Sequence, residues 1–418
     1  MLQFIKQLVV AIALSFYLFS IGFPFLPAGV NTKMMLAILG VIFLVFEWLN
    51  TKKITVSWEM LGATGFAIIF SLICYFTTDF NHTSDYSYAN YFVTFFVWLG
   101  GAYAVCTIMR ATHGTANLRL LTFYAAAVCF GQCIIALIID RIPAFQKFVD
   151  SLIEQGQDFD RKIGRLYGIG ASLDSAGIRF ALILLLIAAV LSKDQQVRAS
   201  RKTTVLLLIA FFTIAVVGDM IARTTGVGFG LAIVYFMLNI GFLQFVIKKE
   251  HFKFYAIFGG MLLLTVAASV YLYNTDVNFH SDMRFAFEGF FNWSEHGEFK
   301  TSSTDKLNDV MWIWPSDLKT WIIGTGRFGH FIFSTDIGYC RFILYCGLVG
   351  FSVFALFFVY NAIVFAIKYK MYRDLFLLLL IYSFIIWVKV STDIFFLYAL
   401  LYCMDMERYQ KYHRRKLT

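Results

Sequence analysis

Charged residues are scarce in this chain. Only 15% of its 418 residues are Asp, Glu, Lys or Arg, and 60% are hydrophobic, whereas a soluble domain carries about 25% charged residues. A soluble globular fold is therefore excluded, and the composition predicts an all-α polytopic membrane protein. Proline occurs only four times. Because no repeat, linker or low-complexity segment interrupts the chain, residues 1–418 are expected to form a single integral membrane domain.

Patterns that bind metals or cofactors are also missing. The seven cysteines form no CxxC pair and stand near no group of histidines, so they are interpreted as small apolar residues. Asp158 and Asp160 form the DxD pattern of metal-dependent sugar transferases, but so short a pattern recurs often by chance. We expect no metal and no cofactor. The net charge of +9 is spread over short segments between apolar runs, which excludes a nucleic-acid partner.

Apolar windows long enough to cross a bilayer recur along the whole sequence. A hydrocarbon core of about 30 Å requires roughly 20 apolar residues in a helix. Twelve transmembrane helices are predicted near residues 5–27, 34–49, 59–77, 91–109, 119–139, 177–192, 203–218, 226–247, 254–273, 338–366, 375–389 and 393–405. The run from Leu375 to Met404 is the ambiguous one, because it is too long for one crossing and short for two.

Basic residues in the short loops predict the topology. With a cytoplasmic N-terminus, Lys and Arg gather in alternate loops, as the positive-inside rule requires. The basic tail 408–416 lies inside only if the helices number twelve rather than eleven. The two long loops, 140–176 and 274–337, then lie outside the cytoplasm and form the expected active-site face. Aromatic residues among charges at 284–293 and 306–321 predict helices at the headgroup level, serving as anchors or as a substrate lid.

The segment 321–350 holds the densest group of residues capable of chemistry. It turns on Gly324, Gly326 and Gly329 and then enters an apolar helix with Asp336, Tyr339 and Arg341 at its mouth. The glycines match GxGxxG, but a dinucleotide site is excluded because no strand precedes them. They either turn the chain sharply or bring backbone N–H groups to a phosphate. Charges at a membrane boundary indicate function, unless they are helix-end charges that reach the interface.

Five arginines are predicted on the outer face, against the positive-inside bias: Arg165, Arg179, Arg223, Arg327 and Arg341. A guanidinium group holds phosphate oxygens through paired hydrogen bonds and stays charged at any relevant pH. Converging arginines at outer helix ends would therefore bind a lipid-linked diphosphate. Each arginine has the alternative of pairing with a nearby carboxylate such as Asp174, Asp219 or Asp336.

Several motifs together resemble a known family. I-I-G-T-G (322–326), S-T-D-I-G-Y-C-R (334–341) and Y-C-G-L-V-G (345–350) follow a large outer loop late in a chain of about twelve helices. With further similar segments at 165–177 and 222–226, the whole chain resembles the O-antigen polymerase and O-antigen ligase superfamily. The resemblance implies a GT-C-like α-helical glycosyltransferase that acts on the periplasmic face of a bacterial inner membrane.

Two spacings favour a polymerase over a ligase. Ten residues separate Arg327 from Gly338, as in the polymerase pattern, whereas Arg165 misses the same spacing to Gly177 by one residue. Ligases carry a histidine eleven residues before the first glycine of a GxxG pair, and in this chain that position holds Asp336. The ligase pattern is therefore not met.

The resemblance also implies a site and its partners. The general base is either Asp336 or His330, with Arg341 beside it as a catalytic residue. The implied substrate-binding residues are Arg165, Arg179, Arg223, Arg327, Tyr167, Tyr339 and Gly326. The substrate is an undecaprenyl-diphosphate-linked oligosaccharide, whose glycan passes to another lipid-linked repeat unit without a metal. Membrane lipids and a chain-length regulator protein are the other expected partners. Asp336 has the structural alternative of capping its helix or pairing with Arg341.

Three other functions remain open. A ligase that joins the glycan to lipid A core or another acceptor shares the architecture. A lipid-linked monosaccharide transferase is disfavoured because the first outer loop, 28–33, has no carboxylate. A flippase or transporter would place charges at mid-membrane and break paired helices, whereas most internal charges here lie at outer helix ends.

Overall fold

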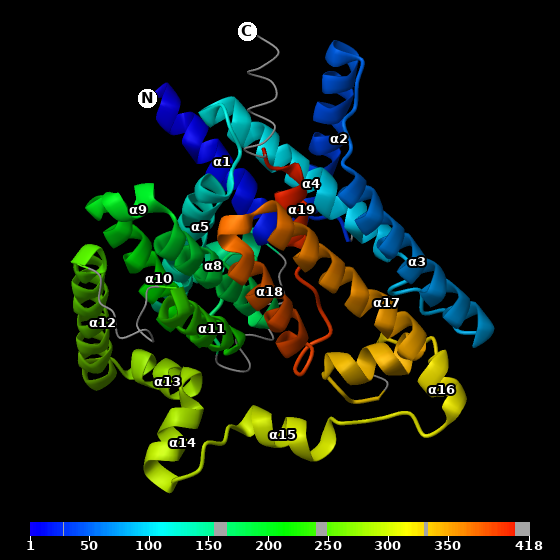
Figure 1. Cartoon of the computed structure of the whole chain (residues 1–418). Coiled ribbons are helices and arrows are strands. Elements are labelled where there is room, and N and C mark those ends of the chain that lie inside the picture. The colour runs from blue at the N-terminus through cyan, green and yellow to red at the C-terminus, as the bar shows by residue number, and fades with distance from the viewer. Residues whose placement is uncertain (28, 154–164, 240–248, 330–332, 406–418) are drawn as a thin grey trace. The chain divides into compact units, whose positions relative to one another are not determined.

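The fold is helical. The computed structural model describes residues 1–27, 29–153, 165–239, 249–329 and 333–405, and in these ranges the only β-structure is an isolated bridge between Gly22 and Asn31 (Figure 1). The all-α prediction is confirmed. Within the same ranges, eight helices are long and apolar enough to cross a membrane: α2 (Thr32–Thr51), α3 (Trp58–Phe80), α4 (Tyr91–His113), α5 (Leu118–Arg141), α8 (Leu173–Lys193), α10 (Arg201–Ile221), α12 (Lys249–Thr275) and α17 (Gly338–Lys368).

Each of the twelve predicted segments contains a helix, but some ends differ. The first helix, α1 (Leu2–Leu18), ends well before residue 27. Pro24 and Pro27 lack the N–H that a continuing helix needs. The chain instead closes a loop, in which the Ile21 N–H donates to the Thr32 hydroxyl at 3.1 Å and the Thr32 N–H donates to the Ile21 carbonyl at 3.0 Å. The eighth segment contains α11 (Thr224–Asn239), and its end lies outside the described residues.

The last apolar run forms two helices, as the twelve predicted segments place them, and the number of crossings in this run remains a prediction. α18 (Arg373–Ile386) and α19 (Phe395–Cys403) are separated by a turn in which the Val390 N–H donates back to the Ile386 carbonyl at 2.8 Å. The Trp387 indole N–H donates to the Thr392 carbonyl at 2.6 Å and holds this turn. At about 1.5 Å per residue, each helix is shorter than a hydrocarbon core of about 30 Å. Twelve full crossings therefore remain a prediction.

Short helices occupy the long predicted loops and two of the turns. They are α6 (Pro143–Leu152), α9 (Gln195–Ala199), α13 (Val277–Ala286), α14 (Glu288–His296), α15 (Ser302–Val310), α16 (Leu318–Ile322) and the 3-10 turn Lys370–Tyr372. The loop 274–337 is thus structured, as expected, although residues 311–317 are not helical. Trp312, Trp314 and Trp321 stack in sequence with ring centroids 5.6 and 5.7 Å apart. Such exposed tryptophans suit an interfacial anchor.

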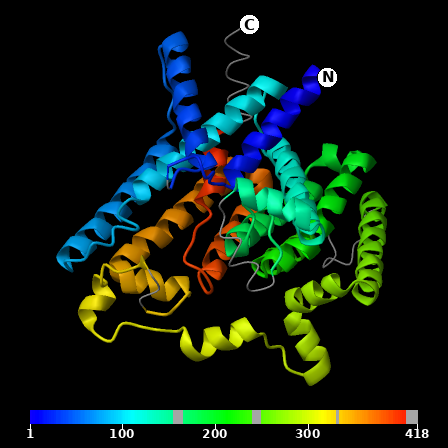
Figure 2. The same ribbon diagram turned by 180° about the vertical axis from the view of Figure 1, so that it is seen from behind.

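The contacts divide the chain into two compact units. Unit 1 comprises residues 1–36, 104–291 and 404–418, and unit 2 comprises residues 37–103 and 292–403. Each unit is discontinuous in sequence, and the expected single domain remains a prediction. In unit 1, α8 is the core, because its side chains from Gly177 to Ser192 are buried except Arg179. α12 stands at the edge of unit 1 in both views (Figure 1, Figure 2), and none of its apolar window is buried.

Unit 2 is built around α17, which packs against α3, α16, α18 and α19. The helix breaks at Gly347, whose φ of 64° and ψ of −176° are not helical. A side chain at this position would overlap the backbone of Ile322 and Ile323, at the end of α16. The residue must therefore be glycine, both for its left-handed φ and for the close approach of the two segments.

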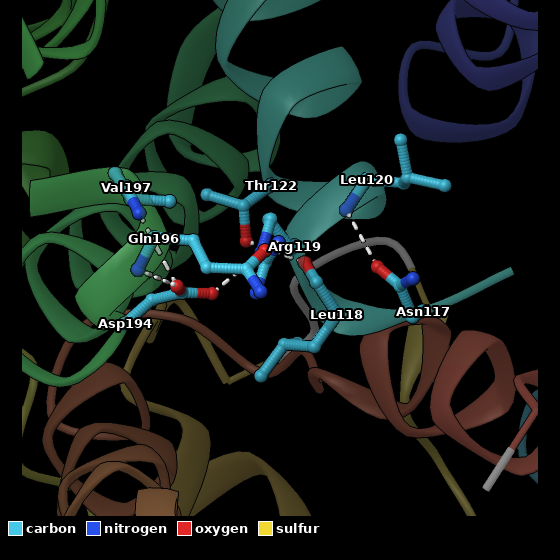
Figure 3. A network of polar contacts seen from close by, with 8 residues as sticks. All are labelled: Asn117, Leu118, Arg119, Leu120, Thr122, Asp194, Gln196 and Val197. Carbon is cyan, nitrogen blue, oxygen red and sulfur yellow. Dashed lines mark hydrogen bonds and ion pairs between the residues drawn. The ribbon is translucent and has the colours of Figure 1, made fainter. Parts of the chain in front are cut away.

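Each unit brings together loops that the topology predicts on one side. In unit 1, Arg119 at the start of α5 pairs with Asp194 at the end of α8 at 2.5 Å and also bonds Gln196 (Figure 3). In unit 2, Lys368 at the end of α17 pairs with Glu59 at the start of α3 at 3.3 Å. These neighbouring helices therefore run antiparallel, as the alternating topology requires.

Candidate functional site

The glycine turn 324–329 is anchored on the broken helix α17. The N–H groups of Thr325 and Gly326 donate to the carbonyls of Leu344 and Tyr345 at 2.7 and 2.9 Å. These carbonyls precede the break at Gly347, where regular helical partners are lost. The turn thus caps the first half of α17 and fixes its mouth.

The remaining N–H groups of the turn are also engaged. Gly324 donates to the Thr320 carbonyl at 3.0 Å, and Arg327 donates to the Thr325 hydroxyl at 3.3 Å. Phe328 and Gly329 donate to Asp85. Of the two interpretations of the glycines, the structure therefore favours a sharp turn over backbone binding of a phosphate at Gly326.

Asp85 is a candidate site residue that was not predicted from the sequence. One carboxylate oxygen accepts the N–H groups of Phe328 and Gly329, each at 2.6 Å, and the other accepts the N–H and hydroxyl of Ser87. Partial burial disfavours the charged form, but these donors outweigh it and hold the pKa of Asp85 below its usual value. The charged Asp85 therefore links the loop after α3 to the glycine turn.

Arg341 lies at the same end of unit 2. Its guanidinium donates to the Ser391 hydroxyl and to the Phe328 carbonyl, both at 2.8 Å, and its carbon lies 3.9 Å from the centre of the Phe328 ring. The Ser391 carbonyl also accepts the Tyr88 hydroxyl at 3.2 Å. Three loops, which follow α3, precede α17 and follow α18, therefore converge on this arginine. All three are predicted on the outer face.

An open groove of about 730 Å³ lies beside Asp85, a volume within the usual range for ligand sites. It is lined by residues 82–87, Asn90, Arg327 and Gly329. The groove offers hydroxyl, amide, imidazole and guanidinium groups, and the Arg327 side chain is exposed in it. We call this the polar groove. It can hold a phosphate or a sugar, because both bind through such donors and acceptors.

Asp336 is exposed at the mouth of α17. The residue that caps α17 is Ile337, without a side-chain hydrogen bond, and the Thr335 hydroxyl accepts the Ile337 N–H at 3.2 Å. The capping alternative for Asp336 is therefore wrong. The Tyr339 hydroxyl donates to the Phe384 carbonyl at 2.9 Å, which ties the same helix start to α18. His330 lies outside the described residues.

Unit 1 brings two predicted arginines together. The guanidinium carbons of Arg165 and Arg223 lie 4.9 and 4.1 Å from the centre of the Phe285 ring. Arg223 also donates to the Phe285 carbonyl at 2.9 Å and pairs with Glu288 at 2.5 Å. We call Arg165, Arg223, Phe285 and Glu288 the arginine pair site. The sequence signal for Phe285 is the aromatic stretch 284–293, which predicts an anchor or a lid.

The other predicted residues of unit 1 have structural contacts. Arg179 donates to the Ser175 carbonyl one turn earlier on α8. Tyr167 is buried in a cluster with Ile21 and Ile139. Its hydroxyl lies 3.2 Å from a carboxylate oxygen of Asp150. Their binding roles remain predictions.

The glycine at 177 has a packing role. A side chain there would overlap Thr224, at the start of α11, so glycine permits the close approach of α8 and α11. The Asp158 and Asp160 pattern lies outside the described residues.

A topology argument could have found the polar groove, because Asp85 and Arg327 fall in predicted outer loops. The hydrogen bonds of Asp85 with Phe328 and Gly329, across more than 200 residues, have no local sequence signal. Compared with known proteins, the chain matches no family model, no curated protein and no solved structure.

Proposed function

We propose that this protein is a membrane glycosyltransferase that polymerises oligosaccharide repeat units carried on a polyprenyl diphosphate. The twelve apolar segments cross a bacterial inner membrane, and the chemistry takes place on the periplasmic side. Membrane lipids surround the protein, and a chain-length regulator protein acts with it.

The convergence of Arg165 and Arg223 on one Phe285 ring is the observation that carries this proposal. Two guanidinium groups lie against one ring, and Arg223 also pairs with Glu288. The planar donors of arginine match the oxygens of a diphosphate, and their positive charge favours its binding. The site therefore suits the leaving group of a lipid-linked glycan.

The reaction follows from these groups. An acceptor sugar hydroxyl attacks the anomeric carbon of the donor glycan, and the bond to the diphosphate oxygen breaks with its electron pair on that oxygen. Preorganised arginines stabilise this charge in the transition state. The acceptor proton passes to a general base.

Asp336 is the stronger candidate base among the described residues. Its carboxylate is exposed at the mouth of α17 and caps no helix. Asp85 is a poor base, because four donors hold its charge and its pKa is lowered. His330 is the other candidate that the family resemblance implies.

The test is polymer formation by the purified full chain on a synthetic lipid-linked repeat unit. Arg165→Lys and Arg223→Lys keep the charge but lose the planar fork, so each should lower turnover by about tenfold or more. Arg201 lies at the start of α10, whereas Arg223 follows its end. Arg201→Lys is therefore the matched control, and this variant should form polymer normally. Normal turnover in both site variants would overturn the diphosphate role.

The same assay separates the rival functions. A wild-type chain that transfers glycan only to lipid A core is a ligase. A chain that moves lipid-linked glycan across vesicles without forming glycosidic bonds is a flippase. Either result would contradict the polymerase proposal.

A further inference from the structure

A second groove of unit 2 adjoins the polar groove. It has a volume of about 640 Å³ and is lined by Ile68, Ser71, Leu72 and Tyr75 of α3, Phe92 of α4, and the loop residues Tyr86, Ala89 and Asn90. We call it the apolar groove. Tyr86 and Asn90 line both grooves. The two grooves therefore meet along the loop that joins α3 to α4.

The wall of the apolar groove is suited to hydrocarbon. Ile68, Leu72 and Tyr75 are between 42% and 50% exposed, and they lie on α3, a helix long enough to cross a membrane. The Ser71 hydroxyl accepts the Phe92 N–H at 2.9 Å, so this backbone donor at the wall is satisfied. A hydrocarbon chain can lie there because satisfied polar groups lose no water on contact with it.

Aromatic residues mark the junction of the two grooves. The rings of Tyr75 and Tyr86 pack with centroids 5.6 Å apart and an interplanar angle of 32°. Tyrosine favours the level between hydrocarbon and water, since its ring is apolar and its hydroxyl is polar. The junction therefore matches the boundary between the tail and the head of a lipid.

The polar end matches a phosphate and a sugar. Arg327 supplies the positive charge, and Thr83, Ser84 and Asn90 supply neutral polar groups. Asp85 stays charged, and its N–H and hydroxyl donors stabilise that charge. One amphiphile can thus contact both grooves at once.

We propose that the two grooves together bind the acceptor substrate, with its isoprenoid chain in the apolar groove, its diphosphate on Arg327 and its first sugar among the hydroxyl groups. The identity of this lipid rests on the proposed function. Polymerisation consumes two lipid-linked molecules. The proposed function assigns the leaving diphosphate of the donor to the arginine pair site, so the acceptor requires a site of its own.

The head should dominate the affinity. Inside a bilayer, a lipid tail leaves surroundings as apolar as the groove, so the hydrophobic effect favours neither place. Charge-assisted hydrogen bonds from Arg327 are therefore the main source of binding. The groove aligns the tail with the polar groove, so a large side chain that fills it should keep the head of the lipid from reaching Arg327.

The experiment measures binding of undecaprenyl diphosphate, without glycan, to the full chain in phospholipid nanodiscs by native mass spectrometry. Arg327→Ala and Leu72→Trp should each weaken binding by about tenfold or more. Matched controls are Arg373→Ala, an exposed arginine at the start of α18, and Ile69→Trp, an equally exposed neighbour that does not line the groove. Both controls should bind like the wild type. If thermal unfolding shows that the Leu72→Trp variant is not folded, Ile68→Trp takes its place.

Two results would overturn the proposal. The first is unchanged binding in both groove variants or equal loss in the controls. The second is equal displacement of the probe by phosphatidylglycerol, which would make the grooves a site for bulk anionic lipid.

Polymer assays on the same variants separate this proposal from the proposed function. If both groove variants form normal polymer, the acceptor-site proposal is wrong and the polymerase proposal stands. If the wild type binds the probe specifically but forms no glycosidic bond, the polymerase proposal is wrong and the grooves are a binding site for polyprenyl diphosphate.

Discussion

The carbonyl group of Ile322 occupies the space that a side chain on Gly347 would need. This contact couples the turn before α17 to the break inside it, and it explains why the break is placed at a glycine of positive φ.

Gly347→Ala should destabilise unit 2. The left-handed φ costs about 1–3 kcal/mol for a residue with a side chain, and the overlap with Ile322 adds to it. We expect a loss of about 2 kcal/mol or more, measured by thermal unfolding in detergent. Gly65→Ala in α3 is the control, because nothing lies within 4 Å of the added methyl group. It should be neutral or slightly stabilising. Equal melting temperatures for the two variants would contradict the predicted strain at position 347.

Asp85→Asn should loosen the glycine turn. Asparagine keeps the shape but replaces one accepting oxygen with a donor, so two of the four bonds are lost. Hydrogen bonds to a charged group contribute about 1.5–3 kcal/mol each. We expect faster hydrogen exchange at the amides of Phe328 and Gly329 and a loss of about 1–3 kcal/mol. Asp79→Asn, at the exposed end of α3, should change neither. Unchanged exchange in Asp85→Asn would refute the link.

Asp282 should make stability depend on pH. Burial, and then the charge of Asp140, raise its pKa to about 6, against the lowering effect of Arg141 and with a further increase from Asp276. A carboxyl with a raised folded pKa stabilises the fold below its unfolded pKa, and this contribution is lost as pH rises through about 6. Asp282→Asn should therefore stabilise the protein at pH 7.5 and flatten the profile between about pH 4 and 6. The gain should be about 1 kcal/mol, since solvent screens a partly exposed group.

Asp276→Asn is the control, because it should change the melting temperature in the opposite direction. Its carboxylate accepts the Phe279 N–H and pairs with Arg141, and these contacts lower its pKa. Losing the charge should lower the melting temperature at pH 7.5. If both variants shift the melting temperature in the same direction, the assignment for Asp282 is wrong.

Asp336→Asn tests the general base. Because Asp336 caps no helix, the substitution should leave stability unchanged. Removing a general base should lower turnover by about 10²–10⁴-fold. His330→Gln is measured in parallel on the same synthetic repeat unit. Near-normal turnover in Asp336→Asn would transfer the role to His330, and loss in both would show that the two act together.

Single cysteines test the topology. Those at Ser151 and Asn308 should react with an impermeant maleimide in intact spheroplasts, whereas one at Lys202 should react only after lysis. The background should be low, because six of the seven native cysteines are buried. Protection of both outer positions would contradict the periplasmic site.

Hydropathy located the helices, because a span of lipid requires a continuous apolar run whatever its neighbours are. It failed at residues 19–27, where prolines and the Thr32 hydrogen bonds end α1 early. It also missed the break at Gly347, since an apolar run carries no record of φ.

Contacts between residues that are far apart in the sequence could not be predicted, and this limited the prediction of the site. The outer arginines were identified one by one from topology, but no spacing shows that Arg165 and Arg223 share Phe285. Asp85 escaped notice because a lone aspartate in a polar loop is common, and only the fold brings it to Phe328 and Gly329. Single charged residues in outer loops were therefore easier to identify from the sequence than the contacts between them.

The cap on the first half of α17 has a consequence for motion. The carbonyls of Leu344 and Tyr345, on buried residues of α17, would lose these partners if the turn 324–326 withdrew. Withdrawal would cost several kcal/mol for each exposed group. The turn and the half-helix are therefore expected to travel as one rigid piece whenever a substrate enters or leaves, with Gly347 as their hinge.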